Sequence, residues 1–197
     1  TASNNTAVGY SALGANTTGA ENTALGANAL DANTTGADSL ALGFNALTTN
    51  TTGGSNVATG HQSLQNNTTG SSNVAVGRNA MQANTTASNN TGIGYKALEA
   101  NTTGNANTAV GALALDANTT GVELTAVGKS ALSASTGSYN TAMGSGAMTT
   151  TTSGTHNSAF GRIALSLNTT GANNVAVCSR ALYANTTASN NTAVGAS

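Results

Sequence analysis

Proline and tryptophan are absent from this chain of 197 residues, and aromatic residues make up only 3% of it. The lack of proline fits a backbone whose N–H groups are needed in hydrogen-bonded ladders, and it argues against collagen and proline-rich linkers. Charge is scarce as well, with five Lys plus Arg, six Asp plus Glu and a net charge of −1. We therefore expect neither nucleic-acid binding nor a polybasic membrane patch.

Cysteine is represented by Cys178 alone, so no disulfide can form within the chain. No run of 18 apolar residues occurs, and membrane insertion is not expected. The apolar fraction is 38% and consists largely of alanine, which is too little large side chain for a thick globular core. The chain starts in the middle of a repeat, so we expect a slice of a longer repetitive protein, with any signal peptide outside it.

A tandem repeat organises the whole chain. Its consensus is N-T-A-V-G-x-x-A-L-x-A-N-T-T-G-x-x, numbered here as positions 1 to 17, and one unit is a residue shorter. We expect a single array over residues 1–197, with units starting at residues 5, 22, 39, 56, 73, 90, 107, 124, 140, 157, 174 and 191. Disordered chains seldom space Val and Leu so regularly, and two glycines per unit disfavour a helix.

The pattern within each unit predicts two strands joined by turns. Positions 2 to 5 alternate with a period of two, and positions 7 to 10 are expected to form a second short strand. We expect positions 3, 4, 8 and 9 to be buried, with the residues at positions 4 and 9 in one core. Because position 3 is almost always alanine, we expect a second packed layer, from another copy of the chain, against that side.

The Asn-Thr-Thr-Gly segment at positions 12 to 15 has the composition of a turn in which glycine takes a positive φ. If each unit forms one coil, neighbouring coils lie about 4.8 Å apart and the asparagines of position 12 form an amide ladder. Asn-Thr-Thr is also a glycosylation sequon, and this reading stays open beside the structural one for Asn16, Asn33, Asn50, Asn84, Asn101, Asn118, Asn168 and Asn185.

Charged residues fall only at positions 6, 7, 10 and 17, which predicts a solvated rim, with ion pairing between fibres as the alternative. His61 and His156 lie in variable positions of distant units, so we expect exposed side chains and no metal or catalytic site. Cys178 replaces the glycine of position 5, and we interpret it as a tolerated small residue, with an interchain disulfide or thiol chemistry as the alternative. No catalytic residue, cofactor site or metal site is expected.

The consensus N-T-A-V-G-x-x-A-L-x-x-N-T-T-G resembles repeats in tail-fibre-type proteins of phages and bacteria. Strings such as Asn107-Thr108-Ala109-Val110-Gly111 are also similar to repeats in YadA-like heads of trimeric autotransporter adhesins. These resemblances cover nearly the whole chain and imply an extracellular, cell-surface or virion location and a homotrimer or filament of identical chains. Any receptor or glycan would be bound by regions outside this segment.

We therefore expect an all-β solenoid or β-roll with about one coil per repeat, forming an elongated, self-associating rod. Its expected role is that of a structural or adhesive fibre segment without catalysis. The alternative is an ice-binding solenoid that uses repeated threonine arrays, although position 2 mixes Thr6 with Leu40 and Val57. A solenoid enzyme would need clustered acids or bases, and the acids here are spread over different units.

Overall fold

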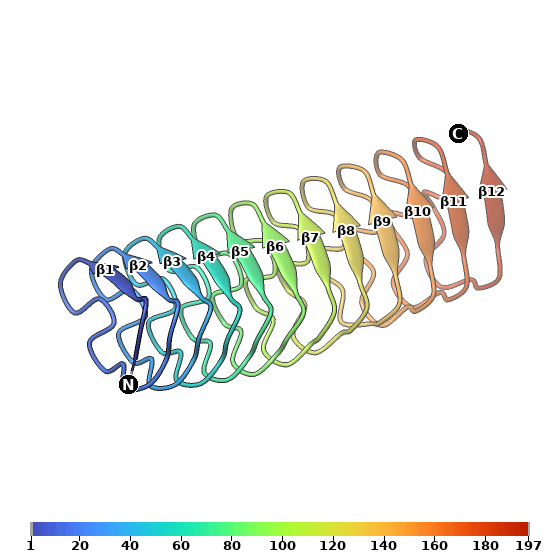
Figure 1. The fold of residues 1–197 in the computed structure, drawn as a ribbon. Helices are drawn as coiled ribbons and strands as arrows, with labels where there is room; N and C mark the ends of the chain where they lie inside the picture. Colours follow the sequence, from blue (N-terminus) through green and yellow to red (C-terminus); the bar gives the residue numbers. More distant parts are fainter. Residues whose placement is uncertain (1, 197) are drawn as a thin grey trace.

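The computed structural model describes residues 2–196, so the two ends of the expected array, residues 1 and 197, lie outside it. The described chain winds into a rod with the N-terminus at one end and the C-terminus at the other (Figure 1). Each repeat contributes one three-residue strand at positions 2 to 4. The strands are β1 Thr6–Val8, β2 Thr23–Leu25, β3 Leu40–Leu42, β4 Val57–Thr59, β5 Val74–Val76, β6 Thr91–Ile93, β7 Thr108–Val110, β8 Thr125–Val127, β9 Thr141–Met143, β10 Ser158–Phe160, β11 Val175–Val177 and β12 Thr192–Val194.

These strands form one parallel sheet in sequence order, β1 to β12. Equivalent residues face each other across each pair, as Ala109 and Ala126 do between β7 and β8. The short unit does not disturb this register, because Thr125 still pairs with Thr141 and the missing residue is taken from the bend after Ser135. The predicted β-solenoid with one coil per repeat is confirmed, and at about 4.8 Å per coil its eleven or so coils span about 50 to 55 Å.

The core lies inside the coil and is made of small residues from opposite walls. Alanines of positions 3 and 8 and Leu or Met of position 9 are fully buried in the central coils, for example Ala109, Ala114 and Leu115 at 0% exposure. Position 4 points outward instead, with Leu25 at 51% and Ile93 at 38% exposure. The expectation that position 4 shares the core was therefore wrong, because a coil this thin has room inside only for alanine on the strand wall.

This arrangement also shows that the alanines of position 3 are not evidence for a packed layer from another copy of the chain. The alanine side of the strand is covered by positions 8 and 9 of the same chain, which form the facing wall of the coil. Uniform alanine at position 3 thus reflects the narrow interior of one coil and carries no information about other copies. Where Gly92 replaces this alanine, the Met81 side chain fills the space, since a Cβ on Gly92 would lie 2.9 Å from Met81 Cγ.

The second predicted strand, at positions 7 to 10, is absent from the described residues, and consecutive turns take its place. Residues at positions 7 and 9 have positive φ in coil after coil, including 56° at Lys96 and 54° at Leu98. Their backbones still bond to the neighbouring coils: the Leu98 N–H donates to the Ala114 carbonyl at 3.0 Å. Position 9 carries only Leu and Met, which fits its burial in the core and a left-handed backbone that disfavours β-branched side chains, although Ile163 adopts this backbone at position 7.

Both glycine positions of the repeat are explained, but not as the sequence suggested. At position 5 the glycines lie at φ between 128° and 146°, a region that side chains rarely adopt. At position 15 the glycines lack the positive φ that was expected and lie close to the next coil, and Ala87 and Ala188 are the two residues with a side chain at this position. A Cβ on Gly53 would collide with the carbonyl oxygen of Gly70 in the next coil and would lie 2.7 Å from Asn50 Oδ1.

Candidate functional surface

The asparagines of position 12 form the amide ladder that the repeat predicted. Asn50 Nδ2 donates to Asn33 Oδ1 at 2.9 Å, and Asn67 Nδ2 donates to Asn50 Oδ1 at 2.8 Å. The second hydrogen of each Nδ2 is directed to the backbone carbonyl three residues later, as from Asn50 to Gly53 at 2.9 Å and from Asn84 to Ala87 at 3.0 Å. The ladder runs unbroken from Asn16 to Asn118, and it is interrupted where Ser135 and Thr151 replace asparagine.

This geometry bears on the sequon reading of the same residues. Asn33, Asn50, Asn84, Asn101, Asn118 and Asn168 have 0% exposure, while Asn16 and Asn185 near the two ends are partly exposed. A glycan replaces one hydrogen of Nδ2, and in Asn33 both hydrogens are used, one by Asn16 and one by Gly36. The packed ladder therefore disfavours glycans at the six buried positions, and of these eight asparagines only Asn16 and Asn185 are accessible.

Sequence reasoning missed a second ladder at position 1. Asn107 Oδ1 accepts a hydrogen bond from the Leu124 backbone N–H at 3.0 Å, and Asn107 Nδ2 donates to the Gly121 carbonyl at 2.8 Å. The near-invariance of asparagine at position 1 was the signal that could have identified it. Together, the two ladders satisfy buried backbone groups in the bends, where no strand partner is available.

The outer side of the sheet exposes large apolar side chains along the rod, including Val8, Leu25 and Ile93. We call it the strand face and define it as the outward-pointing residues of positions 2 and 4 in β1 to β12. Position 2 supplies Thr, Val, Leu or Ser, and position 4 supplies larger groups such as Met143 and Phe160 at 43% and 40% exposure. The face thus combines a largely apolar column at position 4 with a column at position 2 that is Thr or Ser in eight of the twelve strands, and so much outward apolar surface is unusual where a protein contacts only water.

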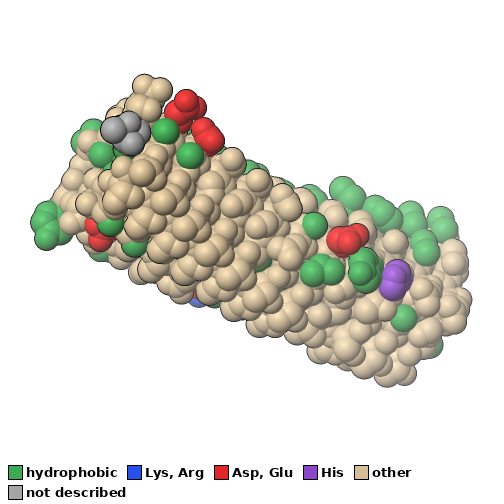
Figure 2. All heavy atoms as spheres, turned by 60° about the horizontal axis from the view of Figure 1, so that its bottom comes forward, with side chains coloured by type: hydrophobic (Ala, Val, Ile, Leu, Met, Phe, Trp, Pro, Cys, Tyr) green, Lys and Arg blue, Asp and Glu red, His purple; other side chains and the backbone are tan. Residues whose placement is uncertain are grey.

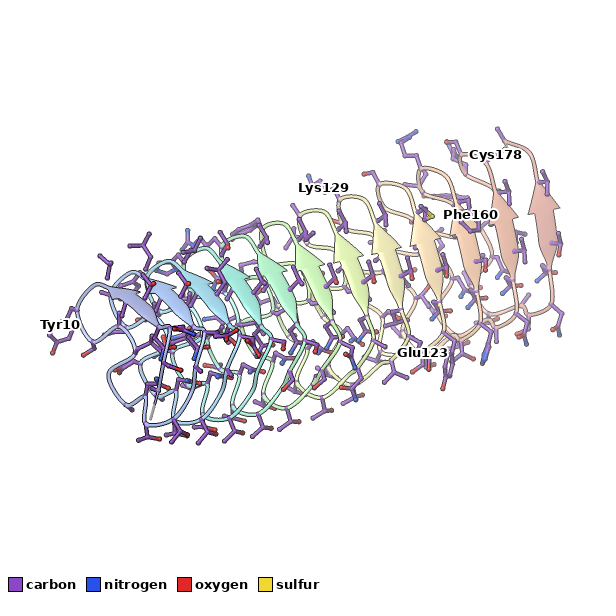
Figure 3. All side chains as sticks on the ribbon, in the orientation of Figure 1. Tyr10, Glu123, Lys129, Phe160 and Cys178 are labelled. Atoms are coloured by element: carbon purple, nitrogen blue, oxygen red, sulfur yellow. The ribbon has the colours of Figure 1, made fainter. Side chains whose placement is uncertain are left out.

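Two columns of different charge border the strand face. The basic edge is position 6, two residues after each strand, where Arg78, Lys129 and Arg162 lie among Tyr10, Phe44, His61 and Tyr95. The acidic edge is position 17, two residues before each strand, and holds Glu21, Asp38 and Glu123. Figure 3 shows Lys129 and Glu123 at opposite ends of β8. In Figure 2, the side of the rod that carries the acidic edge consists mainly of uncharged side chains and backbone.

The candidate residues for chemistry lie on the surface and are separated from one another. His61 and His156 are exposed, as predicted, and each stacks on an aromatic ring of the preceding coil: Phe44 at 5.5 Å and Tyr139 at 4.9 Å between ring centroids. Cys178 is exposed, and its φ of 102° is lower than the 128° to 146° of the glycines at the same position in the other coils. Within residues 2–196, no group of three or more His, Cys, Asp or Glu side chains is placed to hold a metal ion.

The environment of Asp116, at position 10, changes the ionisation of its carboxyl. Its Oδ1 is buried without a hydrogen-bond partner among the described residues. Burial raises the pKa of Asp116 above its ordinary value, and the Glu99 carboxylate of the neighbouring coil adds to this effect. Glu99 is itself paired with Lys96 at 3.1 Å between Nζ and Oε1. The carboxylate form of Asp116 is therefore less favourable in the folded chain than in the unfolded one.

We expect Asp116→Asn to stabilise the chain at pH 7 and to have no such effect at pH 3. A raised carboxyl pKa means that the folded state binds more protons than the unfolded state between the two pKa values. Stability from this group is thus lost as pH rises through that window, which begins near pH 4. Thermal unfolding of both proteins at both pH values measures the difference. Asp31→Asn, at the same position without an acidic neighbour in its column, is the control, and a lower melting temperature for Asp116→Asn at pH 7 would contradict the argument.

Comparison with family models, curated proteins and solved structures finds no match to this chain. The resemblance to tail-fibre-type and adhesin repeats therefore stays a prediction. Within the described part of the chain, no helix has the length and apolarity to cross a membrane.

Proposed function

We propose that this chain is a segment of a structural or adhesive fibre at a cell or virion surface, and that its work is to provide length and stiffness without catalysis. The observation that carries the proposal is the regularity of the rod: every coil from β1 to β12 contributes the same in-register parallel strand, and the same columns of buried Ala and Leu or Met line its interior. A shaft needs this property, because each added repeat extends it by the same step without a new fold.

The contacts between coils support a mechanical role. Each inner strand bonds to both neighbours, and the ladders of positions 1 and 12 add side-chain bonds at most steps, as from Asn84 to Asn67 at 2.8 Å. Threonines of position 13 add another, since Thr68 Oγ1 donates to the Thr85 carbonyl at 3.0 Å. Pulling two coils apart would break all of these bonds at once, so the rod resists extension along its axis.

The threonine arrays support ice binding less well. The hydroxyl hydrogens of position 13 are already used between coils, as from Thr102 to the Thr119 carbonyl at 3.1 Å. On the strand face, the threonines of position 2 are interrupted by Leu40 and Val57, and bulky side chains such as Phe160 project beside them at position 4. We expect no thermal hysteresis and no turnover of polysaccharides by this chain.

A tandem fusion tests the shaft role. Residues 1–9 recur identically at 187–195, so joining residues 1–186 to a second copy of residues 1–197 keeps the repeat in phase. In electron micrographs we expect one straight rod of unchanged width that is longer by about 53 Å, because eleven coils are added. A matched control inserts eight extra residues at the junction, which breaks the phase. Two separate particles from the in-phase fusion, or a fusion no straighter than the control, would contradict the proposal.

A further inference from the structure

We infer that the strand face is an interface on which a second copy of this chain docks through its own strand face, with the two rods parallel and in register. The inference deepens the proposed function by naming the partner of the shaft, and it rests on that function. Three features of the molecule support it: the size of the exposed, uncharged face, the period of the apolar column at position 4, and the charges at the two edges of the face.

The strand face is large enough for a specific interface. Twelve strands at about 4.8 Å give a length of about 55 Å, and the width from the acidic edge to the basic edge is about 18 Å, so the strand face and its two edges together cover about 1,000 Å² per copy. A standard specific interface covers about 800 Å² per partner. The middle of the face is free of charge, because positions 2 and 4 contain no Asp, Glu, Lys or Arg in any strand. An uncharged centre with polar rims is the usual anatomy of a protein interface.

The period of the face selects a copy of this chain over an unrelated partner. Outward side chains of position 4, such as Leu25, Ile93 and Met143, form ridges spaced by one coil along the rod. A partner that fits these ridges along the full length must repeat at the same spacing of about 4.8 Å. Another solenoid with the same spacing between coils meets this condition in every coil. A second copy of this chain has that spacing by definition.

Charge at the edges selects the parallel arrangement. A two-fold axis along the rods places the basic edge of one copy opposite the acidic edge of the other. In register, Lys129, two residues after β8, then faces Glu123, two residues before β8, and symmetry makes this contact twice. An antiparallel pair with aligned ends places β5 opposite β8 and so brings Arg78 against Lys129, also twice. Like charges in that arrangement repel, and opposite charges in the parallel one attract.

Ile93→Asp tests the interface itself. Ile93 points outward from β6, so the substitution places a charge in the centre of the strand face without entering the core. We expect sedimentation equilibrium to show dimers for the parent chain and at least a tenfold weaker dimer for Ile93→Asp, with circular dichroism unchanged. Thr103→Asp, an exposed residue of the bend in the same coil, is the control and should leave the dimer intact.

Charge reversal tests the orientation. Lys129→Glu and Glu123→Lys should each weaken the dimer about threefold to tenfold, and the double variant should restore it, since rim pairs contribute modestly and two pairs are reversed together. These residues are not paired with each other within one chain, because they lie at opposite ends of β8. Equal, additive losses in the double variant would overturn the parallel register.

Crosslinking gives a second reading of orientation. In a Cys178→Gly background, which restores the residue found at position 5 in the other coils, Leu25→Cys places one thiol near the N-terminal end of the face. A short bifunctional thiol reagent should join two such chains in a parallel dimer. In an antiparallel dimer, β2 lies against β11, and the two thiols are about 43 Å apart. Crosslinking only when Leu25→Cys is mixed with Val177→Cys would show antiparallel rods and overturn the inference.

A monomer at all concentrations, or a trimer as the smallest species, would also overturn the pairing. Neither outcome affects the rod length of the tandem fusion, which is measured on single particles. The failure of the interface and the failure of the shaft role are thus separate results.

Discussion

Gly111→Ala is expected to lower the melting temperature by about 10 °C, corresponding to about 3 kcal/mol of unfolding free energy. Gly111 occupies position 5 at the corner after β7, with φ at 136°, where a side chain is strained whatever the space. Space is lacking too, since a Cβ would lie 2.6 Å from the carbonyl carbon and oxygen of Gly128 in the next coil. Those atoms are backbone, so relief would require separating two coils in the middle of the rod.

Gly54→Ala is the matched control for this experiment. Gly54 lies at position 16, where alanine already occurs at residues 20, 37 and 172, and its φ is not positive. We expect a change of less than about 0.5 kcal/mol. Thermal and chemical unfolding of both variants measures the two effects. Equal stability of Gly111→Ala and Gly54→Ala would show that the corner tolerates side chains and that the account of position 5 is wrong.

The repeat in the sequence was sufficient to predict the architecture. A constant spacing of like residues can be satisfied by stacking like on like, and the position-12 ladder follows from the same stacking. The strand at positions 2 to 4 was also predictable, because its alternation with a period of two is strong. Each of these features depends only on spacing along the chain, which the sequence displays directly.

The sequence pattern could not show which face of the strand points into the coil. Alternation separates Ala109 from Val110 but does not say which of the two points inward, and residue size favoured the wrong answer. The outcome depends on how thin the coil is, and this is set by the turns of positions 7 to 10. Those turns require a left-handed backbone at leucine, as in Leu98 at 54°, which no residue preference predicts. Because the alanine face was assigned to the outside of the coil, a second packed layer from another copy was wrongly predicted against it.

The candidate surface follows from the same correction. Once position 4 is placed outside, the apolar columns predicted as core become the exposed face of the rod. Positions 6 and 17, predicted as a rim, become the two edges of that face. Their opposite charges were visible in the sequence as separate columns, but their meaning depends on which side of the strand faces outward.

Asn67→Asp should be the most damaging isosteric change in the chain, with a loss of more than about 4 kcal/mol at pH 7. Asn67 is fully buried, and its Nδ2 donates to Asn50 Oδ1 at 2.8 Å and to the Gly70 carbonyl at 2.9 Å. A carboxylate has no hydrogen to donate, so it would place negative oxygens against two acceptors inside the coil. Only the bond from Asn84 Nδ2 would still be satisfied.

The loss should depend on pH in a direction that identifies its cause. Burial beside two acceptors raises the pKa of the introduced carboxyl, so the folded state binds a proton more readily than the unfolded state. Stability of the variant is then lost as pH rises above about 4, and the deficit relative to the parent should shrink on acidification, because the protonated acid regains one donor. Unfolding curves recorded between pH 3 and pH 8 measure this profile.

Two further variants separate the charge from the packing. Asn66→Asp alters the exposed neighbour one residue earlier and should change stability by less than about 0.5 kcal/mol. Asn67→Ser should cost about 1 to 2 kcal/mol, because serine occupies the same position at Ser135, where its Oγ donates to the Gly137 carbonyl at 3.2 Å. If Asn67→Asp were no worse than Asn67→Ser at pH 7, the amide ladder would be a consequence of stacking and not a source of its stability.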